Sequence, residues 1–83
     1  MRKKKRVEFG EYIVSDPEIC GGQLTFKGTR ILVKSVLYYV SKGWDWDRIS
    51  HECFDRVSHA AIAEAIQLAS EALLNKAEKQ RAA

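Results

Sequence analysis

Two basic side chains, Lys27 and Arg30, flank the Gly28-Thr29 step in the first half of the chain. Glycine adopts the left-handed backbone conformation of tight turns at little cost, so this step predicts a stiff corner that displays both cations. A guanidinium binds carboxylates and phosphates through two parallel hydrogen bonds, and an ammonium acts on them as a point charge. We therefore expect Lys27 and Arg30 to bind an acidic partner surface or nucleic acid.

The same corner also has a purely structural interpretation. The glycine can be required by the backbone alone, and Arg30 can pair within the chain with a carboxylate such as Asp16 or Glu18. Exposure of the Arg30 side chain would favour the binding role over the structural one.

Five consecutive basic residues near the start of the sequence account for its net charge. The chain has 83 residues, with 14 lysines and arginines against 11 acidic residues and a net charge of +3. Without this run the rest of the chain is slightly acidic, so the run alone would attract DNA, with an affinity that falls as salt rises. We expect residues 1–11 to form a flexible basic arm. Its candidate nucleic-acid contacts are Arg2, Lys3, Lys4, Lys5 and Arg6.

Side chains that could hold a metal or act as nucleophiles are few and poorly spaced. His51 and Cys53 are two residues apart, which on a helix turns them to different faces. His59 lies beside Ser58, but nothing in the sequence supplies a third group that would orient such a pair for catalysis. We expect no metal, no cofactor and no catalytic site, so we interpret the chain as a binding protein and not an enzyme.

Composition and cysteine usage indicate the class of protein. The chain is 46% hydrophobic and 30% charged, as globular domains commonly are, and its only cysteines are Cys20 and Cys53. Two distant cysteines indicate reduced thiols, and Cys53 is predicted to be a small core residue. No apolar stretch follows the basic run as in a signal peptide, and none reaches the ~20 residues that cross a bilayer. We expect a cytoplasmic protein without a membrane partner.

The first half of the sequence, which contains Lys27 and Arg30, has patterns typical of short strands. Residues 12–14 form a β-prone run, residues 24–27 alternate apolar and polar side chains, and residues 30–32 can form another strand. We therefore expect a small β element over residues 12–32.

Helical spacing of apolar residues begins at Val33. A first helix is predicted to end near Gly43, a second and short one to be capped by Asp45, and a third to be capped by Ser58 and to run to Lys79. The predicted fold class is α+β, mainly α: an N-terminal short β element followed by a helix-turn-helix-like, homeodomain-like three-helix bundle. The single domain is expected to span residues 12–75, followed by a fraying tail, residues 76–83.

In a helix-turn-helix, the first turns of the recognition helix enter the major groove of DNA. Here those turns carry no arginine or lysine, and the polar side chains suited to contact DNA are Ser58, His59 and Gln67. A helical core that reads DNA and one that does not are both compatible with the sequence.

An apolar stripe on the third helix is a candidate dimer contact. A chain this short has a thin core, and a helix of about 30 Å extends beyond what such a core covers. The stripe can also pack within the chain. The residues of this candidate interface are Ile62, Ile66, Ala69 and Leu73.

Two motifs in the first half of the chain resemble a known family. The first is Asp-Pro-Glu-Ile-Cys-Gly-Gly at residues 16–22, and the second is Gly-Thr-Arg-Ile at residues 28–31. With the capped short helix that follows, they make residues 12–70 similar to domain-of-unknown-function family 433. The sequence departs from that family at Leu24 and Leu32, where the family usually has prolines.

The resemblance implies a homeodomain-like fold and the role of an antitoxin encoded beside a PIN-like nuclease toxin. On this basis we expect the chain to neutralise such a toxin, with Lys27 and Arg30 at carboxylates of the nuclease, and to bind its own promoter DNA as a second role. We also expect a homodimer. The alternatives are a stand-alone DNA-binding transcriptional regulator and a purely structural dimerisation module.

Overall fold

A computed structural model describes residues 5–82 of the chain. In this range a three-stranded antiparallel sheet precedes three α-helices, so the predicted class, α+β and mainly α, is confirmed. The strands follow the order β1-β2-β3 in the sheet, and a short 3-10 helix, η1, links β2 to β3. The elements are β1 (Val7–Glu8), β2 (Ile13–Ser15), η1 (Cys20–Gly22), β3 (Leu24–Phe26), α1 (Val33–Ser41), α2 (Trp46–Glu52) and α3 (His59–Ala82).

Two of the expected strands are present as β2 and β3. They lie antiparallel with Ile13 opposite Phe26, and both of these side chains are 2% exposed. The third expected strand, residues 30–32, is reduced to a single bridge between Thr25 and Leu32. The chain starts α1 directly after that bridge, so no room remains for a longer strand.

The strand β1 lies in the region for which a flexible arm is expected. Val7 pairs with Ser15 and Glu8 pairs with Val14. Part of the expected flexible arm, residues 1–11, is therefore ordered, because backbone hydrogen bonds hold β1 in the sheet. Arg2, Lys3 and Lys4 lie outside the described residues.

The helix boundaries follow the predicted caps. Gly43 has a φ of +81° just beyond the end of α1. At the start of α2, Asp45 Oδ1 accepts the Arg48 N–H at 2.8 Å, and at the start of α3, Ser58 Oγ accepts the Ala61 N–H at 3.1 Å. Each side chain satisfies a backbone donor that the first turn of a helix leaves free.

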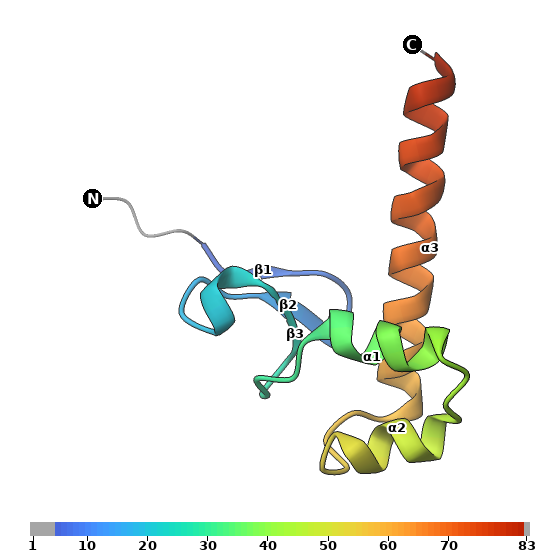
Figure 1. Ribbon diagram of the computed structural model, residues 1–83. Coiled ribbons are helices and arrows are strands. Elements are labelled where there is room, and N and C mark those ends of the chain that lie inside the picture. The colour runs from blue at the N-terminus through green and yellow to red at the C-terminus, as the bar shows by residue number, and fades with distance from the viewer. Residues whose placement is uncertain (1–4, 83) are drawn as a thin grey trace.

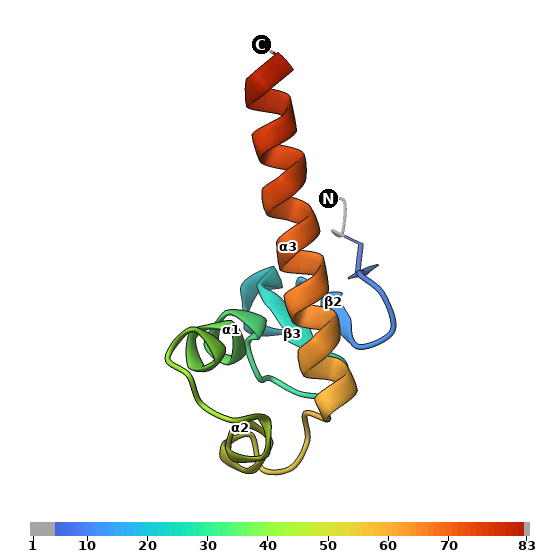
Figure 2. The same cartoon turned by 90° about the vertical axis from the view of Figure 1, so that its right-hand side faces the viewer.

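The core lies where the sheet meets the three helices (Figure 1). The helix α1 contacts β3, α2 and α3, and α2 also packs on the first turns of α3. Beyond this core α3 continues alone, away from the rest of the molecule (Figures 1 and 2). The tail expected to fray from residue 76 is helical to Ala82. The apolar core residues are Ile13, Val14, Phe26, Val33, Val36, Ile49, Cys53, Val57, Ala61, Ile62 and Ala65.

Candidate partner-binding surface

The Gly28-Thr29 corner forms one wall of a shallow depression of about 640 Å³. Gly28 has a φ of +76°, and Thr29 Oγ1 donates to the Phe26 carbonyl at 2.8 Å while accepting the Ile31 N–H at 3.0 Å. The hydroxyl thus fixes the corner from both sides. The depression is lined by Ile19, Gly28, Thr29, Arg30, Ile31, Phe54 and Arg56.

Arg30 is exposed on this wall. None of the ion pairs formed among residues 5–82 uses its guanidinium. Asp16, one of its expected structural partners, accepts the Glu18 N–H at 2.9 Å instead. The structural interpretation of Arg30 as half of an internal ion pair therefore does not hold, and the guanidinium faces solvent.

Phe54 is the feature of this surface that stability does not explain. Its side chain is 82% exposed, the largest fraction among the exposed large hydrophobic residues. Phe54 and Asp55 both have a φ of +57°, a left-handed conformation that costs non-glycine residues about 1–2 kcal/mol each. Their N–H groups donate to the carbonyls of His51 and Ser50 at 3.0 and 2.8 Å, so the turn has a fixed geometry. Backbone strain of this kind clusters at functional sites.

Arg56 completes the surface. It is exposed, takes part in no ion pair among the described residues, and lines the same depression as Arg30 and Phe54. Arginines and aromatic residues are enriched at protein interfaces. One weak signal for Phe54 is present in the sequence, a large aromatic residue in a short connection between two predicted helices. We name Arg30, Phe54 and Arg56 the arginine–phenylalanine surface.

Lys27 does not join Arg30 in this site. Its ammonium lies 3.2 Å from Glu8 Oε1 and donates to the Gly10 carbonyl at 3.2 Å, and its side chain is half-buried. These contacts tie β3 to β1 and to the loop that follows it. The structure therefore does not bring Lys27 and Arg30 together: the lysine contacts Glu8 and Gly10, and the arginine that lines the depression with Arg30 is Arg56.

A protein-family model identifies the chain's relatives. The family described as Protein of unknown function (DUF433) matches residues 13–69, which is more than half of the chain. The chain belongs to this family. Searches of the curated proteins and of the solved structures found no match.

The DUF433 match covers both motifs and the whole arginine–phenylalanine surface. In the first motif the chain turns through Cys20, Gly21 and Gly22 with φ angles of +52°, +66° and +86°. Ser15 Oγ closes this turn by donating to the Gly22 carbonyl at 2.6 Å. Glycine tolerates such angles, which explains the Gly-Gly pair. The turn leads β2 into β3 and so sets the position of the Gly28-Thr29 corner.

The DNA contacts expected near the start of α3 are engaged within the domain. Ser58 caps the helix, His59 Nε2 lies 2.8 Å from Asp47 Oδ1, and Gln67 Nε2 donates to Glu71 Oε2 at 3.1 Å. All three side chains are exposed, and His59 and Gln67 each contact a carboxylate. These two contacts bring negative charge, which repels DNA, to this part of α3.

The four residues of the expected dimer stripe differ in how exposed they are. Ile62 is 0% exposed and belongs to the core of its own chain, so the expectation is corrected there: no second chain can contact it. Ile66 is half-buried against the same core, whereas Ala69 is exposed and Leu73 is 66% exposed. An apolar groove of about 350 Å³ lies beside the exposed part. Its walls include Phe9, Leu24, Leu37, Leu68, Ala69 and Ala72.

The two cysteines are free thiols in different surroundings. Burial raises the pKa of the Cys53 thiol, with a smaller contribution from the Glu52 carboxylate, and its predicted core position is confirmed. Within residues 5–82 no three His, Cys, Asp or Glu side chains gather closely enough to hold a metal ion. In the same range, every helix is too short or too polar to cross a membrane.

Proposed function

We propose that this chain is an antitoxin that binds and neutralises a cognate PIN-like nuclease toxin, and that it acts by binding and not by catalysis. The observation that carries the proposal is Phe54, held exposed on a left-handed turn, with Arg30 and Arg56 on the same depression and in no ion pair within residues 5–82. The antitoxin role that the DUF433 resemblance implies agrees with a surface built for protein contact.

The proposed chemistry of neutralisation is carboxylate binding. A metal-dependent nuclease gathers carboxylates at its active site, and each arginine can donate two parallel hydrogen bonds to one of them. An arginine bound to a carboxylate in this way competes with the metal ion for the carboxylate oxygens. Phe54 would enter an apolar pocket of the toxin, where full burial of its ring contributes about 1.5–3 kcal/mol.

Co-expression with the nuclease encoded beside this gene tests the proposal. The wild-type chain is expected to copurify with the nuclease and to abolish its RNA cleavage. Arg30→Glu combined with Arg56→Glu should weaken binding at least 100-fold, because like charges brought together at an interface cost several kcal/mol. Arg81→Glu, at an exposed position far along α3, is the matched control and should neutralise as the wild type does.

Two outcomes would count against this proposal. A wild-type chain that fails to bind the neighbouring nuclease removes the antitoxin role. A double variant that still neutralises the nuclease removes the arginine–phenylalanine surface as its site.

Two further parts of the proposed function concern other surfaces. We propose that the basic residues 2–6 bind promoter DNA, supported by the exposure of Lys5 and Arg6, and a gel shift with the promoter fragment tests this role. We also propose a homodimer formed through the exposed part of α3 and the apolar groove beside it, supported by the exposure of Leu73.

A further inference from the structure

The outer side of α1 carries cations and aromatic rings in alternation. Lys34, Tyr38 and Lys42 are spaced four residues apart, so they form one exposed row along the helix. Tyr38 is 58% exposed, and the Lys42 ammonium lies 5.2 Å from the centroid of its ring. Lys34 and Tyr38 also line a shallow hollow of about 410 Å³ together with Ser35 and Tyr39.

The alternation continues from α1 onto α2. The Tyr39 ring stacks on the Trp44 ring with centroids 4.4 Å apart and planes 8° apart. The guanidinium carbon of Arg48 lies 3.6 Å from the centroid of Trp44. These contacts join the two helices, so a structural role accounts for these three side chains.

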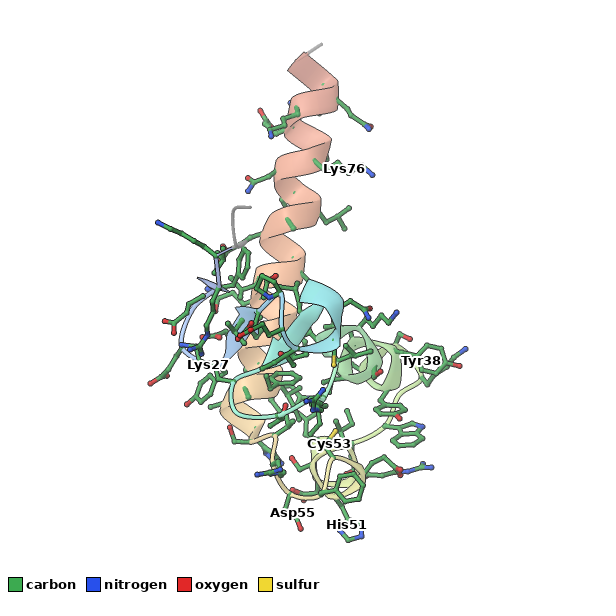
Figure 3. The ribbon with its side chains drawn as sticks, turned by 90° about the vertical axis from the view of Figure 1, so that its left-hand side faces the viewer. Lys27, Tyr38, His51, Cys53, Asp55 and Lys76 are labelled. Atoms are coloured by element: carbon green, nitrogen blue, oxygen red, sulfur yellow. The ribbon has the colours of Figure 1, made fainter. Side chains whose placement is uncertain are left out.

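Tyr38 differs from these three side chains, because the ring and cation that it contacts, Tyr39 and Lys42, do not belong to α2. Its ring meets Tyr39 only edge-on, with centroids 6.2 Å apart, and more than half of the side chain faces solvent. Tyr38 lies at the margin of the molecule, on the opposite side from Lys27 (Figure 3). An aromatic ring exposed between two lysines is available to a ligand.

The surface is positively charged. Among the described residues, none of Lys34, Lys42 and Arg48 takes part in an ion pair, and α1 contains no acidic residue. The acidic residue nearest in sequence to this row, Asp45, uses its carboxylate to cap α2. A face with cations on both sides of an exposed ring is complementary to a polyanion that also carries flat rings.

We propose that this surface, defined by Lys34, Tyr38 and Lys42, binds single-stranded nucleic acid. Bases of a single strand can stack on the exposed Tyr38 ring, whereas bases inside a duplex are stacked on each other and out of reach. The flanking cations bind the phosphates. Because any base can stack on the ring, binding has little sequence preference. The proposal is independent of toxin neutralisation, since the arginine–phenylalanine surface shares no residue with this one.

Fluorescence anisotropy of a labelled single strand of about 12 nucleotides, and of the matching duplex, tests the proposal. Residues 2–6 are replaced by serine in every sample, so that the basic run does not mask the surface. We expect the single strand to bind more tightly than the duplex, with an affinity that falls as salt rises. Tyr38→Ala should weaken single-strand binding about 5-fold or more through loss of one stacked base, and Tyr38→Phe, which keeps the ring, should bind normally.

Charge is tested with two matched double variants. Lys34→Ala with Lys42→Ala should lower both the affinity for the single strand and its dependence on salt. Lys76→Ala with Lys79→Ala removes two exposed lysines from α3 and should leave the affinity unchanged. Circular dichroism establishes that each variant is folded. Equal or tighter binding of the duplex, or unchanged affinity of Tyr38→Ala, would overturn the proposal.

Discussion

Cys20 and Cys53 have the same side chain but different surroundings. Cys53 is 4% exposed in the core, beside the end of α2, and burial raises the pKa of its thiol. Cys20 lies partly exposed on the left-handed turn before β3. Because the thiolate is the reactive form of cysteine, access and ionisation together decide which thiol reacts.

We predict that iodoacetamide alkylates Cys20 in the folded protein near neutral pH, and alkylates Cys53 only after unfolding. The folded state holds the Cys53 proton more tightly than the unfolded state does. Its contribution to stability is therefore fully present below the unfolded thiol pKa of about 8.5 and is lost as pH rises through the higher folded pKa. Mass spectrometry of the alkylated protein and urea titrations at rising pH measure both effects. Equal labelling of the two cysteines in the folded state would contradict the prediction.

Single residues of the candidate site are only partly predictable from this sequence. The position of Arg30 at the end of a tight turn is predictable, because the Gly28-Thr29 step before it indicates that turn. Phe54 has only the weak signal of an aromatic residue in a short connection between helices, because the left-handed backbone at this non-glycine residue leaves no pattern in the sequence. Arg56 has no sequence signal. The ion pair between Lys27 and Glu8 is not predictable, because Glu8 belongs to a strand too short to show an alternating pattern.

At the scale of elements, one carboxylate joins the sheet to α3. Glu64 accepts the Glu11 N–H at 2.9 Å and the Tyr12 N–H at 2.8 Å, across 53 and 52 positions of sequence. Gly10 makes room for this contact: its φ is +90°, and a Cβ there would lie 2.8 Å from the Glu64 carboxylate. The loop between β1 and β2 is thus held against the first half of α3.

Glu64→Ala is expected to lower the free energy of unfolding by about 1–3 kcal/mol, because two backbone donors lose a charged acceptor. Glu71→Ala, an exposed position on the same helix, is the control and should change stability by less than about 0.5 kcal/mol. Urea denaturation followed by far-ultraviolet circular dichroism measures both. If the two variants unfold at the same urea concentration, the carboxylate does not hold the sheet.

The helices are more predictable than the sheet, and the reason is the range of the interactions. Asp45 and Ser58 cap their helices through hydrogen bonds to residues three positions away, so local sequence is sufficient. The strand β1 depends on pairing with β2 and on the loop contact to the distant Glu64. Strand propensity within two residues cannot reveal such partners.

At the scale of the whole molecule, the second half of α3 lacks support from its own chain (Figures 1 and 2). Every side chain from residue 69 to residue 81 is exposed. A single helix of this length is marginally stable in water, and Leu73 stands on it near an open apolar groove. A second copy that covers both the helix and the groove would stabilise both.

We predict that the wild-type chain is a dimer and that Leu73→Glu converts it to a monomer that keeps its helix content. A charge buried in an apolar interface cannot be compensated there. Gln80→Glu, at an exposed polar position farther along α3, is the control and should leave the mass unchanged. Size-exclusion chromatography with light scattering gives the mass of each. A wild-type chain of monomer mass at high concentration would contradict the prediction.

The left-handed backbone at Phe54 and Asp55 lowers the stability of the fold, and a substitution there would change more than stability. Asp55→Gly would relieve one unfavourable backbone angle, which ordinarily gains about 1 kcal/mol of stability. If Phe54 enters a toxin pocket as proposed, the loosened peptide would also let its ring sample more directions, and this freedom would be lost again on binding. Under that proposal, Asp55→Gly gains stability of the fold and loses affinity for the toxin.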